Sequence, residues 1–222
     1  MLAVFHKSLA EPSVKLMGAV VFENPPTEQS EETMKELSRL FKDEHHDPMA
    51  IHLLPYCILN TALDHQSVIT PSVLTVKDDV VCLFRGAFEN RAELATLYNL
   101  PTPRNDSAVV IWAYNKFCIQ EDETEWLDAV KGFKGGFSFV MYDAKKKALF
   151  VTSGLDGIPC FWGLGPQGTL LFSSCLEIAS TKCESFYGQL PKGCYYASGK
   201  GLRSFESPDV VLKAQFVPPD NQ

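Results

Sequence analysis

The stretch KGFKGGFSFVMYDAKKKALFVTSGLDGIPCFWGLGPQGTLLFSS, from Lys131 to Ser174, decides the fold, because turn-forming residues close each of its four short apolar runs. Bulky side chains occupy nearly every position from Phe137 to Tyr142, so we expect both faces of that strand to be buried. A strand buried on both faces must pack between another sheet and helices. We therefore interpret the stretch as a meander of β-strands over residues 137–142, 148–152, 160–164 and 169–173.

Apolar runs and helical spacing predict the other elements. Leu2 to Phe5 begins an N-terminal strand inside the sheet, and Ser30 is expected to cap a helix that buries Met34 and Phe41. A helix over 91–98 turns Leu94 and Leu97 toward the core. Asn105 or Asp106 is expected to cap the next helix, and the acidic run 121–125 is read as the first turn of another. Further strands are expected over residues 51–58, 67–76, 80–84, 190–196 and 201–205.

Composition and charge restrict the class of protein. With 222 residues and 45% hydrophobic side chains, the chain is long enough for one globular domain over 1–222, ending in an irregular tail over about 217–222. The formal charge of -7 argues against a nucleic-acid partner, because binding to phosphates depends on Lys and Arg. An apolar run of about 20 residues is absent from the sequence, so we expect no membrane span. Neither is a signal sequence recognisable at Met1 to Phe5.

Cysteine and histidine are the residue types that could bind a metal here. The seven cysteines are odd in number and mostly lie in apolar runs, which favours reduced thiols in the cytoplasm, with the nucleus as a further compartment. His45 and His46 are adjacent and flanked by acids, but they lack the usual helical ligand spacing, so a solvated loop competes with a metal site. We expect no metal and no cofactor.

Five segments in order resemble the glutaminase domain of class II glutamine amidotransferases, the N-terminal-nucleophile domain found at the front of asparagine synthetases. The Phe84–Asn90 segment is similar to the NGEIYN turn of that family, and Gly135–Asp143 is similar to its G-x-F-A-F-x-x-Y-D segment. The remaining three similarities lie at residues 105–110, 156–163 and 168–173.

A closer resemblance, over nearly the whole chain, is to the plant stem-specific or aluminium-induced proteins, which consist of that amidotransferase-like domain alone. Segments 1–5, 76–84, 191–196 and 201–206 carry it. The YGL and LRDR motifs of many members are replaced by residues 97–100 and 115–118, which makes this chain a divergent relative. The resemblance implies an α+β fold, a four-layer αββα sandwich of two mostly antiparallel sheets.

The resemblance also implies where a catalytic site would lie. In the amidotransferases a cysteine that follows the removed initiator Met is the nucleophile, and its α-amino group is the base. Leu2 stands at that position, so no catalytic residue is expected, and Met1 should be retained. Arg85 and Gly86 stand where the family has the Asn and Gly of an oxyanion hole, so the glycine alone is kept.

Two further positions of the site match only in part. Asn90 matches the second Asn of the family's turn and could equally be a turn or capping residue. Asp106 matches the acid that holds the α-amino group of glutamine and could equally be a helix cap, while the companion Glu is replaced by Ala108. Arg85, Gly86, Asn90 and Asp106 are therefore candidate vestigial ligand-binding residues.

Several functions stay open at this point. The first is a catalytically inactive binding or scaffold protein of plant stress and hormone responses, which forms a homodimer or binds another protein. The alternative is an amidohydrolase or glutaminase that uses a nucleophile other than the N-terminal residue, for which Cys57, Cys82 and Cys160 are the candidate thiols. Arg85 could bind a carboxylate or phosphate, or simply be a solvated charge. A metal-binding stress protein is the third hypothesis and depends on His45 and His46.

Overall fold

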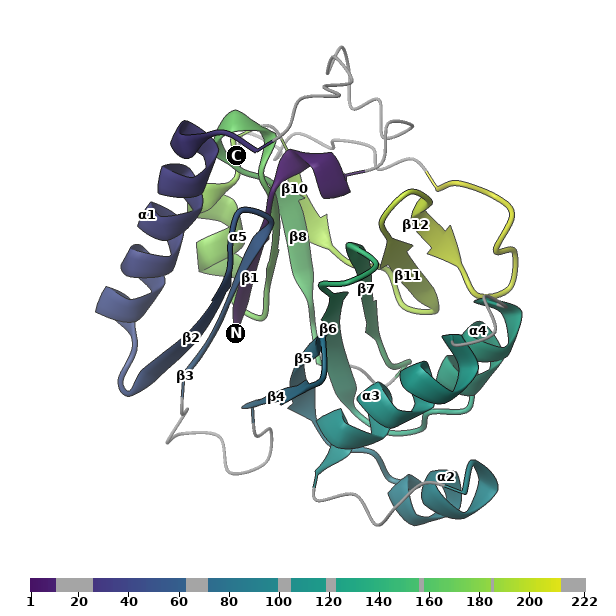
Figure 1. The fold of residues 1–222 in the computed structure, drawn as a ribbon. Coiled ribbons are helices and arrows are strands. Elements are labelled where there is room, and N and C mark those ends of the chain that lie inside the picture. The colour runs from purple at the N-terminus through teal and green to yellow at the C-terminus, as the bar shows by residue number, and fades with distance from the viewer. Residues whose placement is uncertain are drawn as a thin grey trace, which may run out of the picture.

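The computed structural model describes residues 1–10, 26–62, 72–99, 105–118, 123–155, 158–184 and 186–212. Two six-stranded sheets, in which every named strand pair is antiparallel, face each other and are covered on their outer sides by helices (Figure 1). Within the described residues, no helix is both long and apolar enough to cross a membrane. The predicted four-layer αββα arrangement is confirmed.

The first sheet has the order β10-β8-β9-β1-β3-β2, so the N-terminal strand lies in its interior. As predicted, the chain is already part of the sheet at its second residue, where Leu2 lies opposite Asn60 of β3 and Ser173 of β9. The strands of this sheet are β1 (Leu2–Phe5), β2 (Pro48–Leu53), β3 (Cys57–Ala62), β8 (Phe161–Leu164), β9 (Leu170–Ser173) and β10 (Phe186–Gln189).

The second sheet has the order β12-β11-β7-β6-β5-β4, and its central strands β5, β6 and β7 are paired along most of their length. Its strands are β4 (Ser72–Lys77), β5 (Val80–Gly86), β6 (Phe137–Asp143), β7 (Ala148–Ser153), β11 (Cys194–Ala197) and β12 (Gly201–Ser204).

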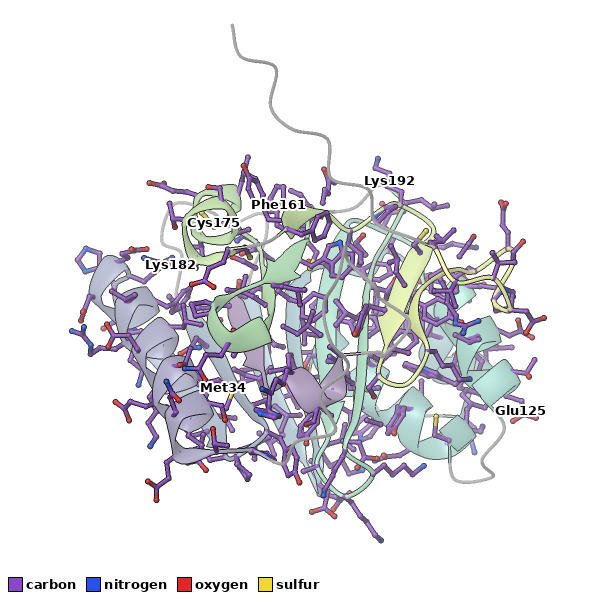
Figure 2. The ribbon with its side chains drawn as sticks, turned by 90° about the horizontal axis from the view of Figure 1, so that it is seen from above. Met34, Glu125, Phe161, Cys175, Lys182 and Lys192 are labelled. Carbon is purple, nitrogen blue, oxygen red and sulfur yellow. The ribbon has the colours of Figure 1, made fainter. Side chains whose placement is uncertain are left out.

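Helices α1 and α5 contact the first sheet, and α3 covers β4 and β5 of the second sheet with α4 beside it. Figure 2, seen from above, shows Met34 on α1 and Glu125 on α4 in the two opposite outer layers. The α-helices are α1 (Glu28–Glu44), α2 (Arg91–Leu97), α3 (Asp106–Phe117), α4 (Glu123–Lys131) and α5 (Leu176–Lys182), and two short 3-10 turns are η1 (Lys7–Leu9) and η3 (Pro166–Gly168).

The core has three parts, one between the sheets and one beneath each helical layer. Along β6, Val140 and Tyr142 belong to the core between the sheets, whereas Phe139 and Met141 belong to the core under α3 and α4. The third core lies between the first sheet and helices α1 and α5. The expectation that both faces of the 137–142 strand are buried is therefore confirmed.

The predicted meander is divided between the two sheets, which corrects the interpretation of residues 131–174 as one continuous sheet segment. Strands β6 and β7 pair in the second sheet, while β8 and β9 pair in the first. The chain crosses from one sheet to the other after Gly154, whose N–H bonds to the carbonyl of Phe137 at 2.8 Å. Local patterns identify each hairpin correctly, but they carry no information about the sheet to which a hairpin belongs.

Three other local predictions were wrong. The expected strand 51–58 is two strands, β2 and β3, because Pro55 lies in a turn that is closed by the Tyr56 N–H bond to the Leu53 carbonyl. Thr27, not Ser30, is the N-cap of α1, and Ser30 returns the bond as the third helical residue of a capping box. Leu97 is 66% exposed, so α2 turns only Leu94 into the core.

Sequence reasoning missed β10, α5 and the 3-10 turn η1, and it placed the start of β11 at residue 190 instead of at Cys194. It predicted three others more closely: β5, α2 and α4 lie where they were expected. Asn105, the first of the two caps considered, caps α3 through a bond from the Ala108 N–H to its side chain at 2.8 Å. Residues 67–71 of the expected strand 67–76 and the tail 217–222 lie outside the described residues.

Candidate functional site

The first residue of the chain is held by three hydrogen bonds to the end of β9. Its amino group donates to Ser174 Oγ at 2.8 Å. Its carbonyl accepts from the Ser174 N–H at 3.1 Å and from Ser173 Oγ at 3.3 Å. Met1 is only 5% exposed, and its side chain belongs to the core between the two sheets. The space at the start of β1 is therefore filled by Met1 itself.

Leu2, where the resemblance places the nucleophile, points the other way. Its side chain is 1% exposed and packs with Met34 of α1 and Ile178 of α5 in the core beneath the helices. Successive side chains on a strand face opposite sides, so Met1 in one core places Leu2 in the other. The residue at the nucleophile position is therefore a buried hydrocarbon side chain, and the buried polar residues Asn60 and Ser173 lie opposite it on the two neighbouring strands.

Arg85 is the candidate residue that the structure brings to the N-terminus. It lies near the end of β5, and its Nη1 donates to Ser174 Oγ at 2.9 Å. The same hydroxyl oxygen thus accepts bonds from the Met1 amino group and from a guanidinium of the opposite sheet. This contact links the two sheets, and the side chain of Arg85 is only partly exposed.

Gly86, the second residue of the former oxyanion pair, is required by backbone packing. Its φ is +108°, which side chains rarely adopt, and a Cβ atom there would lie 2.1 Å from the Gly136 carbonyl oxygen. The retention of this glycine therefore has a structural cause that is independent of catalysis.

Asn90 joins the start of α2 to the segment between α4 and β6. Its Nδ2 donates to the Gly132 carbonyl at 2.9 Å, and its Oδ1 accepts from the Lys134 N–H at 3.0 Å. Although Asn90 is at the N-cap position of α2, its side chain makes no capping bond to that helix. Both ends of the amide thus bond backbone groups of that segment.

Asp106 is the first residue of α3 and not its cap. Its Oδ2 accepts from the Phe88 N–H at 3.1 Å, which fixes the turn that follows β5 against the helix. The guanidinium of Arg91 lies 3.5 Å from its other oxygen, and the carboxylate is 12% exposed. Asp106 and Asn90 therefore bind the loops around α2 and α3, while Arg85 and Met1 face the space between the sheets.

The three candidate thiols are buried and are held in the protonated form. Cys57, Cys82 and Cys160 are each 0% exposed. Burial raises the pKa of Cys57 and Cys82 far above the usual range, and the neighbouring Ser107 hydroxyl opposes this only in part at Cys82. Burial raises the pKa of Cys160 to about 12, against a smaller opposing effect of the N-terminal charge. Because the thiolate is the nucleophilic form, these surroundings disfavour attack by any of the three.

The histidine pair ends a helix. His45 follows α1, its Nδ1 lies 2.9 Å from the Phe41 carbonyl oxygen, and its ring stacks on that of Phe41 with centroids 4.0 Å apart. His46 is exposed. No group of three or more His, Cys, Asp or Glu suited to a metal ion occurs among the described residues.

Sequence reasoning did not identify Ser174, the hydroxyl on which Met1 and Arg85 converge. A serine pair at 173–174, directly after an apolar run, was the available signal. Its meaning depends on the pairing of β1 with β9, two strands that are more than 160 positions apart and whose register the local pattern does not show.

The sequence is similar to those of several known proteins. Residues 2–220 match the family model described as "Aluminium induced protein". The stem-specific protein TSJT1 of Nicotiana tabacum is 26% identical over 153 residues, which cover 68% of this chain and 99% of the tobacco protein. Asparagine synthetase [glutamine-hydrolyzing] 2 of Oryza sativa subsp. japonica is 27% identical over 183 residues, but these are only 29% of its length.

The fold is similar to that of a solved amidotransferase. The structure of glutamine phosphoribosylpyrophosphate amidotransferase from B. subtilis, complexed with ADP and GMP, superposes with a TM-score of 0.50 at 11% identity. The similarity covers 68% of this chain and 35% of that one, and it concerns the fold alone. The two-sheet αββα architecture inferred from the sequence is thus shared with this amidotransferase, and Leu2 lies in its first strand.

Proposed function

Because this chain belongs to the aluminium-induced protein family, we propose that it is a catalytically silent glutamine amidotransferase-like protein. It acts as a binding or scaffold protein in plant stress and hormone responses. The observation that carries this proposal is Leu2, whose side chain has no atom that can attack an amide and is buried beneath the helices. Loss of the nucleophile removes the covalent route itself, and loss of a single catalytic group typically costs several orders of magnitude in rate.

The rest of the site supports the same proposal. The amino group that would serve as the base is bonded to Ser174 Oγ. At the former oxyanion position, Arg85 bonds to the same hydroxyl, and Gly86 has a packing reason to be glycine. Asn90 and Asp106 each bond backbone groups of neighbouring loops. Each retained residue thus has a structural role that explains it without hydrolysis.

An amidohydrolase or glutaminase with a different nucleophile is the competing proposal. It depends on a thiol such as Cys160 becoming ionised, whereas burial raises the pKa of that thiol to about 12. Gly86 and Asp106, which are retained at family positions and would suit such an enzyme, are explained by packing and by loop fixation. We therefore favour the silent protein.

A glutaminase assay tests the proposal. Purified protein is incubated with glutamine, and glutamate is followed by a coupled dehydrogenase, beside Leu2→Ala and Cys160→Ala variants and a blank without protein. We expect all four rates to be equal. Glutamate release that scales with the amount of wild-type protein would contradict the proposal, and its loss in Cys160→Ala would establish the competing mechanism instead.

The same proposal includes a homodimer, a location in the cytoplasm and nucleus, and an unidentified protein partner. Light scattering coupled to size-exclusion chromatography measures the molar mass in solution, and we expect twice the mass of one chain. A single-chain mass at micromolar concentration would remove the homodimer from the proposal and leave the catalytic silence untouched.

A further inference from the structure

The strand β2 forms one edge of the first sheet. Among the described strands it pairs with β3 alone, and it is the outermost strand of that sheet on the side of α1 (Figure 1). A strand at an edge presents a row of backbone N–H and C=O groups that its own sheet does not pair, and such a row can pair with another extended chain. β2 can therefore offer backbone hydrogen bonds to a partner.

β2 is also the least protected of the four edge strands in the described part of the chain. Its six residues, Pro48–Leu53, include no Asp, Glu, Lys or Arg, and its only proline is the first residue. By contrast, β4 ends in Lys77, β12 carries Arg203, which is bridged to Val211, and β10 has only four residues. Because native edge strands are usually blocked by charge, by proline or by shortness, an unblocked edge indicates a surface that is used.

One face of β2 is apolar and incompletely covered. Ile51 and Leu53 pack against the core between the sheets, and Met49 shares their face because side chains alternate along a strand. Met49 is 55% exposed, and the other two are only half-buried. Within the described residues the second sheet ends at β4, which contacts β3, so the first sheet extends one strand further. Apolar side chains of an added strand would be buried against this face.

The other face of β2 has cationic surroundings. His52 lies on this face, beneath α1, and is exposed. Burial lowers the pKa of His52, and the charges of Lys42 and Lys35 on α1 lower it further, so both ammonium groups lie near this edge. Lys35 is close to Glu31 and Glu32, whereas no ion pair of Lys42 occurs in the described part of the chain. An acidic side chain on this face of an added strand would be attracted to Lys42.

These three features define the kind of segment that fits the edge. We propose that β2 is a docking edge for an extended segment of a partner protein, in which apolar side chains alternate with acidic ones. The segment adds one strand to the first sheet, so its main-chain hydrogen bonds give affinity and its alternating side chains give specificity. This inference names the chemistry of the unidentified protein partner and rests on the proposed role as a binding or scaffold protein.

A second copy of the chain fits the same edge less well. A two-fold dimer brings the same surface of both copies together, so Lys42 of one copy would approach the cationic surroundings of the other. β2 has no acidic residue that could offset this repulsion. Charge complementarity therefore favours an acidic segment of a different protein, and the proposed homodimer is expected to use another surface.

The experiment is an NMR titration of the full chain, labelled with ¹⁵N, with three synthetic peptides. The probe is acetyl-EVEVEVE-amide, in which valine and glutamate alternate. Acetyl-EEEEVVV-amide has the same composition without the alternation, and acetyl-KVKVKVK-amide keeps the alternation with the opposite charge. We expect saturable shifts of the Ala50, Ile51 and His52 amide signals with the probe, at a dissociation constant of about 1 mM or tighter, and binding of the other two that is weaker by at least about tenfold. A flat titration with the probe, or equal binding of all three peptides, would overturn the proposal.

A charge reversal assigns the binding to β2. Lys42→Glu should weaken binding of the acidic probe by at least about threefold and should tighten binding of the basic peptide. A structural disturbance would weaken both peptides, so opposite changes identify an effect of charge. The matched control is Lys145→Glu, at an exposed lysine in the turn between β6 and β7, and it should change either affinity by less than about 1.5-fold. Equal effects of the two substitutions would contradict the proposal.

His52→Glu is the second variant, and it places a carboxylate on β2 itself at an exposed position. It should also weaken binding of the acidic probe, while its molar mass by light scattering should equal that of the wild type. A wild-type dimer that becomes a single chain in this variant would assign the edge to a second copy and overturn the proposal. The glutaminase assay on the same samples keeps the two proposals apart: glutamate release with probe binding intact would contradict only the silence, and no binding without release would contradict only the docking edge.

Discussion

At the scale of single residues, the first two side chains of the chain face opposite ways, Met1 into the core between the sheets and Leu2 toward α1 and α5. A polar nucleophile at position 2 would meet the buried side chains of Met34 and Ile178. The substitution thus does more than remove a reactive atom, because it extends an apolar core to the start of β1. Polar side chains remain on both sides of β1, with Arg85 and Ser174 near Met1, and Asn60 and Ser173 opposite Leu2.

Sequence reasoning predicted that Leu2 cannot act as a nucleophile, but it did not predict which core the side chain enters. That a leucine cannot attack an amide follows from its side chain. Which core it enters depends on the pairing of Leu2 with Asn60 and Ser173, two residues supplied by distant strands. Arg85 was recognised as unusual for its charge, but its partner Ser174 is 89 positions away and no local pattern connects them.

Replacing Leu2 by alanine should destabilise the protein by about 2–4 kcal/mol, because a buried side chain is lost from a packed core and leaves a cavity. Leu97→Ala is the matched control, since Leu97 is 66% exposed, and it should cost about 0.5 kcal/mol or less. Urea unfolding followed by circular dichroism measures both. Equal effects of the two substitutions would show that Leu2 is not part of a packed core.

His6 should make stability depend on pH. It is 1% exposed, and its Nδ1 accepts from the Ser8 N–H at 3.1 Å. Burial, and to a lesser extent the charge of Lys7, lowers the pKa of His6 below its ordinary value of 6.5. The unfolded chain therefore binds a proton at a higher pH than the folded chain, so this contribution is complete above pH 6.5 and is lost as the pH falls toward the pKa of the folded state.

The measurement is the free energy of unfolding between pH 7.5 and pH 5, on wild type and on His6→Asn, which keeps an acceptor for Ser8. The variant should lose less stability than the wild type over this range. His52, whose pKa is lowered first by burial and then by Lys42 and Lys35, acts in the same direction and remains in both proteins. The exposed His46, replaced by glutamine, is the control and should follow the wild type, and a His6→Asn curve parallel to the wild type would contradict the assignment.

At the scale of elements, the turn after β5 shows how a catalytic feature can become a structural one. Gly86 packs against the Gly136 carbonyl, and the Phe88 N–H donates to Asp106. Asn90 bonds the backbone of Gly132 and of Lys134. These contacts hold β5 and α2 to α3 and to the segment before β6. The retained residues of the Phe84–Asn90 segment therefore mark the packing of a strand-to-helix turn.

The hairpins and helices were predictable because their signals are local. Alternation and the polar turn 143–147 define β6 and β7, and helical spacing defines α1 and α3. The assignment of β8 and β9 to the other sheet was not predictable, because a two-strand hairpin has the same pattern in either sheet. The cap of α1 was misplaced by three residues, since Thr27 and Ser30 can both cap a helix and only the backbone separates their roles.

Gly86→Ala should cost more than about 3 kcal/mol, because the new Cβ would lie 2.1 Å from the Gly136 carbonyl oxygen at a φ of +108°. The control is Gly199→Ala, which has a φ of +76° but nothing within 4 Å of the added Cβ, so it should cost only about 1–2 kcal/mol for its backbone conformation. Chemical denaturation of both variants gives the difference. A smaller effect at Gly86 than at Gly199 would mean that packing does not explain why this glycine is retained.

At the scale of the whole molecule, the core between the sheets is shared. Phe5 of the first sheet contacts Tyr142 of the second with ring centroids 5.8 Å apart, and Phe172 contacts Tyr196 at 5.6 Å. Each sheet thus buries its inner face because the other sheet covers it. The two-sheet fold is therefore a property of the whole chain. No single segment specifies it, and it was predicted only because several separate segments resemble one family.

A shared core predicts that both sheets unfold together, as expected for one domain over 1–222. Trp162 reports on the core between the sheets and Trp126 on the core beneath α3 and α4. Trp112→Phe/Trp126→Phe leaves Trp162 as the fluorescent probe, and Trp112→Phe/Trp162→Phe leaves Trp126. In each variant, the urea transition followed by tryptophan fluorescence should coincide with that followed by far-ultraviolet circular dichroism, because each sheet loses its inner core once the other sheet has unfolded and keeps only the core beneath its own helices. Both transitions are measured on the same variant, so the destabilisation that the substitutions cause affects both equally. A fluorescence midpoint clearly separated from the dichroism midpoint in either variant would show that the two sheets unfold as separate units.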